Sequence, residues 1–168
     1  MKPRKLALIL TGAFIAVYSA SSAFAATFYW DNNGSTVGFG NAGGNWAQNS
    51  TSGGNAARWK TFSDGTGSGS NGQATNQSHH LFNFGSGTHG LGSGTINVIG
   101  SVLMGSTTYS SLSGNIVLSG GTINMYNGKT ITVNNSSNTI NSVIGGATDS
   151  LTKDGTGELI FGGANTYT

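Results

Sequence analysis

The chain has 168 residues, enough for one domain of modest size, and its composition is unusual. It contains 29 Gly, 22 Ser, 20 Thr and 18 Asn residues, whereas Asp, Glu, Lys and Arg make up only 7% and cysteine is absent. Disordered chains usually carry more charge and fewer aromatic residues, so we expect an ordered protein that is stabilised by hydrogen-bonded strands and a thin apolar core, without disulfide bonds.

Residues 1–25 predict a secretory signal peptide. A positively charged start precedes an apolar run over residues 6–18, and small residues lead to a cleavage site between Ala25 and Ala26. An apolar run of about thirteen residues is shorter than the roughly 17–25 residues that span a bilayer. We therefore expect the secretion machinery as a partner, and no transmembrane segment in the mature chain.

Removal of the signal peptide changes the charge of the protein. Three of its seven positive residues lie in residues 1–25, so the mature chain keeps Arg58, Lys60, Lys129 and Lys153 against five acidic residues. The net charge becomes −1 with histidine neutral, and no basic patch is left that could neutralise a run of phosphates. The sequence therefore argues against nucleic-acid binding.

Residues 26–90 are interpreted as an aromatic-rich N-terminal region with Gly, Ser and Asn loops. This region holds all three tryptophans, Trp30, Trp46 and Trp59. The first coil of a strand stack exposes its core and its backbone hydrogen-bonding groups, so we expect these aromatic residues to form a cap. The alternative function for them is a platform on which carbohydrate rings stack.

Residues 91–168 are interpreted as a β-strand repeat region. The tripeptide Thr-Ile-Asn occurs at 95–97, 122–124 and 139–141, between turns rich in Gly, Ser and Asn. Apolar residues alternate with polar ones at a period of two, which places them on one face of each strand and places Thr and Asn on the other. The alternating pairs are Ile96 and Val98, Ile116 and Leu118, Ile123 and Met125, and Ile131 and Val133.

Strands of about 4–6 residues are too short to be stable alone. They predict an all-β protein, and we favour a right-handed parallel β-helix in which each coil stacks on the previous one. An antiparallel β-sandwich is the alternative, because Asn33-Gly34, Asn71-Gly72 and Asn127-Gly128 are typical of hairpin turns. An exposed last coil of a β-helix would favour self-association.

The segment 151–168, Leu-Thr-Lys-Asp-Gly-Thr-Gly-Glu-Leu-Ile-Phe-Gly-Gly-Ala-Asn-Thr-Tyr-Thr, resembles the autotransporter-associated β-strand repeat. The matching positions are Leu151, Lys153, Gly155, Gly157, Leu159, Phe161, Asn165 and Tyr167. Gly155 and Gly157 permit a bend or bulge, Leu159 and Phe161 are expected to face the core, and Asn165 to hydrogen-bond its own turn. The resemblance implies the N-terminal part of a large exported passenger with a β-helical stem, which is associated with the outer membrane or cell surface of a Gram-negative-type bacterium.

The sequence does not predict a catalytic, cofactor or metal site. Gly-x-Gly-x-x-Gly occurs at 38–43, 67–72 and 85–90, but no copy is expected to open a helix. His79, His80 and His89 have no cysteine or carboxylate close in sequence, and adjacent histidines on a strand point to opposite faces, so we expect solvated or loop positions. The few acidic residues do not form the carboxylate pair that a glycosidase needs.

Three functions follow from these observations. The first is a structural or adhesive surface protein without catalysis, whose Asn and Thr faces offer a long hydrogen-bonding surface to a ligand that the sequence does not name. The second is a carbohydrate-binding or carbohydrate-active β-helix module. The third is a non-functional fragment of a longer passenger.

Overall fold

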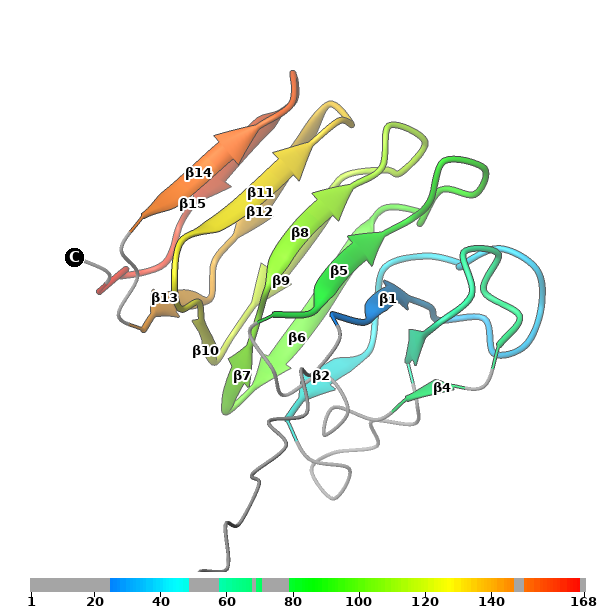
Figure 1. The fold of residues 1–168 in the computed structure, drawn as a ribbon, viewed down its shortest axis with the longest axis horizontal. Coiled ribbons are helices and arrows are strands. Elements are labelled where there is room, and N and C mark those ends of the chain that lie inside the picture. Colours follow the sequence, from blue (N-terminus) through cyan, green and yellow to red (C-terminus); the bar gives the residue numbers. More distant parts are fainter. Residues whose placement is uncertain (1–24, 49–57, 68, 71–78, 147–149, 167–168) are drawn as a thin grey trace, which may run out of the picture.

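The computed structural model describes residues 25–48, 58–67, 69–70, 79–146 and 150–166. These residues form fifteen β-strands and no helix, so no described segment is a helix that could cross a membrane. The strands coil around a single axis, and each coil stacks beside the next, so that equivalent strands of successive coils lie side by side (Figure 1). The all-β prediction is confirmed.

Three sheets make up the coil. Sheet 1 has the strand order β14 (Leu151–Asp154), β11 (Lys129–Val133), β8 (Ser106–Tyr109), β5 (Leu81–Phe84), β1 (Thr27–Trp30), β3 (Trp59–Lys60) and β4 (Gly69–Ser70). Sheet 2 has the order β15 (Glu158–Phe161), β12 (Ser137–Ile140), β9 (Ile116–Ser119), β6 (Gly94–Ile99) and β2 (Asn45–Ala47). Sheet 3 has the order β13 (Val143–Gly145), β10 (Thr122–Asn124) and β7 (Ser101–Leu103).

The pairing between coils is parallel, which confirms the β-helix and excludes the antiparallel sandwich. From β5 onward, paired residues in neighbouring coils are separated by 21 to 25 positions, as between Ile123 and Ile144 or between Phe82 and Thr107. The first coil is longer, because β1 pairs with β5 at a separation of 54 positions and β2 pairs with β6 at a separation of 52. Within the described residues, antiparallel pairing joins only β1 to β3 and β3 to β4. The right-handed sense is the usual hand of parallel crossover connections and stays a prediction.

The hairpin signals form turns, but these turns do not join paired strands. Asn127 and Gly128 have φ angles of 60° and 55°, and they turn the chain between β10 and β11, which belong to different sheets. Asn33-Gly34 lies in the connection from β1 to β2, which also do not pair. Asn71-Gly72 lies outside the described residues. An Asn-Gly turn fixes a local reversal, and the pairing that follows is decided by the apolar faces of the flanking strands.

The predicted one-sided strands are confirmed. All eight residues of the four alternating pairs are buried, at 2% exposure or less, and they join a single core that runs along the inside of the coil. The Thr-Ile-Asn tripeptides, however, are not equivalent positions. Ile96 and Ile140 lie in sheet 2, whereas Ile123 lies in sheet 3, because the true structural repeat is the length of a coil.

Aromatic rings fill the first coil, as expected for the N-terminal cap. Trp59 makes edge-on contacts with Trp30 and Trp46, with ring centroids 5.0 and 5.1 Å apart. These three tryptophans are buried, so the alternative of a tryptophan platform for carbohydrate is wrong. Strands β1, β2 and β5 pair in the same sheets as the later strands, and the division of the chain at residues 90 and 91 stays a prediction.

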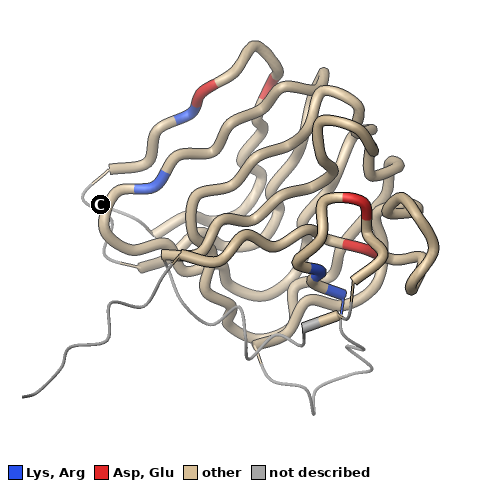
Figure 2. The backbone as a smooth tube through the Cα atoms, turned by 45° about the vertical axis from the view of Figure 1, so that its right-hand side comes forward, with Lys and Arg blue, Asp and Glu red and all other residues tan. Residues whose placement is uncertain are grey.

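Charged residues lie toward the two ends of the coil (Figure 2). Residues 65–128 contain no Asp, Glu, Lys or Arg. Apart from three histidines, the middle coils therefore present only hydrogen-bonding and apolar side chains to a ligand.

Candidate functional site: a neutral groove across sheet 1

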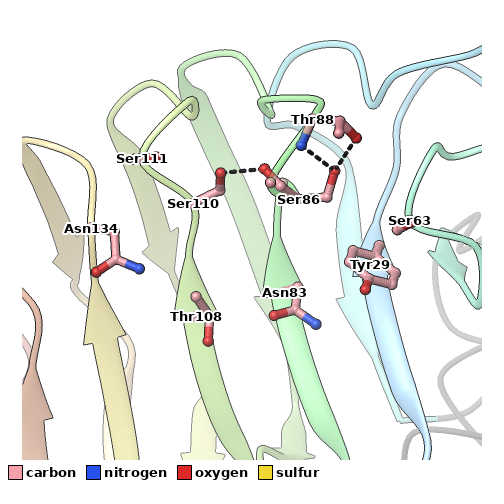
Figure 3. A pocket seen from close by; sticks show the side chains of 11 residues that line it. Tyr29, Ser63, Asn83, Ser86, Thr88, Thr108, Ser110, Ser111 and Asn134 are labelled. Carbon is pink, nitrogen blue, oxygen red and sulfur yellow. Dashed lines mark hydrogen bonds between the residues drawn. The ribbon is translucent and has the colours of Figure 1, made fainter.

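A groove of about 340 Å³ crosses the outer surface of sheet 1. Its lining residues are polar or glycine, with one aromatic ring: Tyr29, Ser63, Asn83, Gly85, Ser86, Gly87, Thr88, Thr108, Ser110, Ser111 and Asn134. The volume falls in the range of ordinary small-ligand sites, about 300–1,000 Å³. Five separate parts of the chain contribute to it, and the coiling of the chain brings them together (Figure 3).

The floor of the groove is a row of outward-facing side chains from successive coils. Tyr29 of β1 is paired in register with Asn83 of β5, and Asn83 is paired with Thr108 of β8. Thr108 is paired in turn with Thr132 of β11, and Asn134 lies two residues further along the chain. Neighbouring strands in a sheet lie about 4.8 Å apart, so the row places one polar side chain on each step of that length.

The loop after β5 forms one wall and is held by hydrogen bonds. Ser86 Oγ accepts hydrogen bonds from the backbone N–H groups of His89 and Thr88, at 3.1 and 3.4 Å. Ser110 Oγ, from the next coil, donates to the carbonyl oxygen of Ser86. Figure 3 shows the contacts of Ser86 with Thr88 and Ser110, near Asn83 and Thr108. The wall is therefore fixed before any ligand arrives.

Close approach of two coils also fixes the start of this wall. Gly85 has a φ of +85°, and a Cβ atom there would lie 2.2 Å from Ser113 Oγ. Ser113 Oγ itself donates to the Phe84 carbonyl oxygen at 2.8 Å and accepts from the Leu91 backbone N–H at 3.0 Å. A side chain at residue 85 would break this buried arrangement.

The groove carries no charged side chain. Tyr29 is the one lining residue with a titratable group, and its ring stacks on Phe39 with an interplanar angle of 10°. The floor offers hydroxyl and amide groups that both donate and accept hydrogen bonds. Such a lining can bind a neutral polar ligand, but it does not supply the carboxylate or imidazole that acid–base chemistry uses most often.

A buried ion pair lies outside the groove, in the capped first coil. Lys60 Nζ is 3.6 Å from Asp31 Oδ2, and Lys60 also donates to the Gly67 carbonyl oxygen at 2.9 Å. Burial raises the pKa of Asp31, and the backbone N–H of Asn33 and the positive charge of Lys60 partly oppose that rise.

Two other described groups have a shifted pKa. Burial raises the pKa of Tyr109, whose ring stacks on Phe84. Asp64 is half-buried, and hydrogen bonds from Thr66 lower its pKa.

The residues of the predicted repeat lie in the last described coil. Leu151 and Lys153 are in β14, and Leu159 and Phe161 are in β15, where both pack partly against the core. The side chain of Asn165 bonds to the previous coil, not to its own turn, because Asn165 Oδ1 accepts from the Ile144 backbone N–H at 2.9 Å. Tyr167 lies outside the described residues.

The two glycines of the repeat lie against the preceding coil. Gly155 has a φ of +77°, and a Cβ atom there would lie 2.3 Å from the Val133 carbonyl oxygen. A Cβ atom on Gly157 would lie 1.9 Å from the Asn135 carbonyl oxygen. The spacing between coils thus explains both glycines, in addition to the bend that the sequence predicts.

The predicted cleavage site lies where the described structure begins. Ala25 is exposed, and the backbone N–H of Ala26 donates to His80 Nδ1 at 3.0 Å. The signal peptide itself lies almost wholly in residues that the structure does not describe, and it stays a prediction.

The three histidines lie in turns or connections between strands, which agrees with the loop positions expected for them. His80 is 7% exposed and packs edge-on against Phe28 in the first coil, so it is not solvated. The rings of His79 and His80 lie 4.5 Å apart, because these residues are in a turn and not on a strand. Among the described residues, no group of three His, Asp or Glu side chains is placed to hold a metal ion.

Sequence reasoning missed the groove. The glycine-rich segment 85–90 opens no helix, as expected, yet it forms the wall of the groove. Tyr29 and Asn83 pair directly although they are 54 positions apart. The available signal was the polar, outward-facing half of each strand, which predicted a hydrogen-bonding surface without locating it.

The fold and groove define a class of protein, a parallel β-helix with a polar groove lined by no Asp, Glu, Lys or Arg, and one comparison with known proteins extends that description. The chain is 35% identical over 156 residues, or 92% of its length, to a protein described as "Adhesin BmaC autotransporter" from Brucella suis biovar 1 (strain 1330). The aligned part spans only 4% of that relative.

The other two comparisons found nothing. No protein-family model matches this chain, and no solved structure matches it. The likeness to the Brucella protein supports the resemblance to autotransporter proteins, whereas the assignment of residues 151–168 to one named repeat stays a prediction.

Proposed function

We propose that this chain is an adhesive segment of an autotransporter-type protein on the surface of a Gram-negative-type bacterium, and that it catalyses no reaction. The observation that carries the proposal is the likeness to an adhesin over 92% of the chain, combined with middle coils, residues 65–128, that contain no Asp, Glu, Lys or Arg. A parallel β-helix suits this role because it displays a long surface on a rigid stem whose coils each contact only their neighbours.

The composition of the groove supports binding over catalysis. Its floor consists of an amide, a hydroxyl and another amide from Asn83, Thr108 and Asn134, with Tyr29 at one end. A hydrolase on a β-helix would need carboxylates grouped in such a groove. Asp154 and Glu158, the described carboxylates near the other end of the coil, are exposed and lie in different sheets.

The proposal includes export. We infer that the secretion machinery recognises residues 1–25 and that cleavage leaves Ala26 as the first residue. Mass spectrometry of chain recovered from the periplasm or medium of an expressing Gram-negative host tests this directly. A mature mass that begins at Ala26 supports it, and chain that retains Met1–Ala25 in the cytosol contradicts it.

Adhesion is tested with beads coated with the purified mature chain. Beads carrying the folded chain should adhere to mammalian cell layers or to extracellular-matrix coats at least several times more than beads carrying the same chain after heat unfolding. Albumin-coated beads give the background. Equal retention of folded, unfolded and albumin-coated beads on every surface would contradict an adhesive function.

A further inference from the structure

We propose that the groove across sheet 1 binds a neutral oligosaccharide, with the sugar chain lying across the strands from Tyr29 toward Asn134. This inference rests on the proposed adhesive function and names the ligand class for one surface. The ligand site lies apart from the buried tryptophans and uses the outward side chains of successive coils.

The spacing of the polar side chains is the first argument. In-register parallel pairing repeats a side chain on every strand, about 4.8 Å from the next. That step is close to the length of one pyranose ring in an extended sugar chain. A linear oligosaccharide that crosses the strands would therefore present about one ring to Asn83 and one to Thr108, and a next ring would reach β11 at Thr132, two residues before Asn134.

The hydrogen-bonding groups give the second argument. Sugar hydroxyls both donate and accept, and they are matched by groups that do the same. Within the described residues, no hydrogen bond engages the Thr108 hydroxyl or the Asn134 side-chain amide, so both are available. Asn83 Nδ2 makes one long contact, 3.4 Å, to the Phe28 carbonyl oxygen, which leaves its Oδ1 open to a ligand.

The aromatic ring of Tyr29 gives the third argument for a sugar ligand. Tyr29 lies at one end of the row, half-buried, with its ring supported by Phe39 at a centroid distance of 5.8 Å. A tyrosine held in this way offers an apolar surface to the C–H face of a sugar and a hydroxyl to its polar edge. Figure 3 shows Tyr29 on the side of the groove nearest Ser63, beyond Asn83.

The absence of charged residues from the lining of the groove distinguishes neutral glycans from acidic ones. None of the eleven lining residues is Asp, Glu, Lys, Arg or His. A sialylated or sulfated glycan would have to desolvate its anion without a compensating cation, which costs free energy. The groove therefore favours neutral sugars over acidic ones.

The geometry argues against a peptide ligand. Peptides that bind sheets add a strand to a free edge through backbone hydrogen bonds. The groove lies across β1, β5 and β8, whose edges are already paired with neighbouring strands. Its exposed groups are side chains, which match the substituents of a sugar better than a peptide backbone.

The test uses the purified mature chain on an array of neutral and acidic glycans, followed by calorimetric titration of the neutral oligosaccharide that binds best. The Thr108→Val variant removes one hydroxyl with little change of shape, and Asn83→Ala removes an amide. We expect each to weaken binding about fivefold, and the double variant to weaken it at least tenfold.

Thr95→Val is the matched control. Thr95 is exposed on β6 in sheet 2, so the same substitution there should leave affinity unchanged. The circular dichroism spectrum and urea midpoint of each variant establish that it is folded. Because Thr108 faces outward, its valine variant is expected to keep the fold.

The outcomes separate the two proposals. Binding of neutral glycans that Thr108→Val weakens and Thr95→Val does not supports the groove. No glycan binding, a preference for acidic glycans, or equal affinity of the two variants would overturn it. If the beads described above still adhere in that case, the glycan groove has failed while the adhesive function stands.

Discussion

Asn138 Oδ1 accepts a hydrogen bond from the backbone N–H of Ile116, 22 positions earlier, at 3.0 Å, and so ties two coils together inside the stack. Asn138 occupies an inward position of β12 directly over Ile116 of β9 and is 1% exposed. Its amide nitrogen donates to Asn135 Oδ1 at 2.6 Å, and Asn135 donates in turn to the Gly114 carbonyl oxygen at 2.7 Å. This chain of buried amides satisfies backbone groups at a corner where the strand pairing is interrupted.

Replacement of Asn138 by alanine should therefore destabilise the protein. The change leaves the Ile116 N–H and the Asn135 amide without their buried partner, at a cost of about 2–3 kcal/mol. Urea unfolding followed by circular dichroism measures the loss. Asn97→Ala, at an exposed position of β6, should cost less than about 0.5 kcal/mol. Equal losses in the two variants would mean that Asn138 does not hold the coils together.

Gly157→Ala should also destabilise the protein, because its methyl group would collide with the Asn135 carbonyl oxygen of the coil below. Overpacking of this kind costs about 1–3 kcal/mol. Gly87→Ala is the control, since a Cβ atom there meets nothing within 4 Å. Thermal unfolding should give a lower midpoint for the Gly157 variant than for the Gly87 variant. A Gly157→Ala protein as stable as the parent would contradict the close stacking of the last two coils.

The buried pair of Lys60 and Asp31 makes stability depend on pH. The folded-state pKa of Asp31 lies above its ordinary value of 3.8 because of burial, so the folded chain holds this proton more tightly than the unfolded chain. The contribution of Asp31 therefore lowers the free energy of unfolding as the pH rises through the raised pKa.

Lys60→Met should enlarge that effect. Without the cation the pKa of Asp31 rises further, and at pH 7 a buried carboxylate is left unpaired, at a cost of about 3 kcal/mol. Near pH 3.5 the carboxyl is neutral and the cost should shrink. Urea unfolding at both pH values measures this, with Lys129→Met as the control, since among the described residues the Lys129 amine donates only one exposed hydrogen bond, to the Asn127 carbonyl oxygen at 3.4 Å. A loss for Lys60→Met that stays the same at both pH values would contradict the ion pair.

The tryptophan cluster predicts a spectroscopic signature. Because Trp30, Trp46 and Trp59 are at most 1% exposed, their emission should lie at short wavelength, and acrylamide should quench it weakly. Unfolding in urea should shift the emission to longer wavelength and increase the quenching several-fold. Strong quenching of the folded chain would place tryptophan at the surface and return it to consideration as a ligand platform.

The sequence predicts which face of each strand is buried better than it predicts which strands pair with each other. The alternation of Ile96 with Val98 identifies the buried side, because a strand has a period of two whatever it pairs with. The three Thr-Ile-Asn tripeptides look like one repeat, yet Ile123 lies in another sheet than Ile96 and Ile140. Coil length depends on which strands contact each other between coils, and the sequence shows the turns but not these contacts.

The candidate site was less accessible to prediction for the same reason. Tyr29 and Asn83 lie side by side in the groove because β1 pairs with β5 in sheet 1. The chain between these two strands is long and includes β3 and β4, so the pairing is not visible from the sequence. The sequence predicts that Asn165 bonds within its own turn, which is the usual behaviour of an isolated Asx side chain. In a stack the neighbouring coil offers an unpaired N–H, and the side chain bonds there instead.

The account depends on coil stacking in parallel register, and a cysteine pair tests this most directly. Thr108 and Thr132 face outward on β8 and β11 and are paired in register, and the chain has no other cysteine that could compete. The double variant Thr108→Cys with Thr132→Cys should form an intramolecular disulfide under mild oxidation, because Cα atoms on paired strands lie within the bridging range of about 4.4–6.8 Å. The control pair, Thr108→Cys with Thr139→Cys, places the second cysteine in sheet 2 and should stay reduced. Bridging of the control pair, or failure of the first pair to bridge in folded protein, would contradict the β-helix.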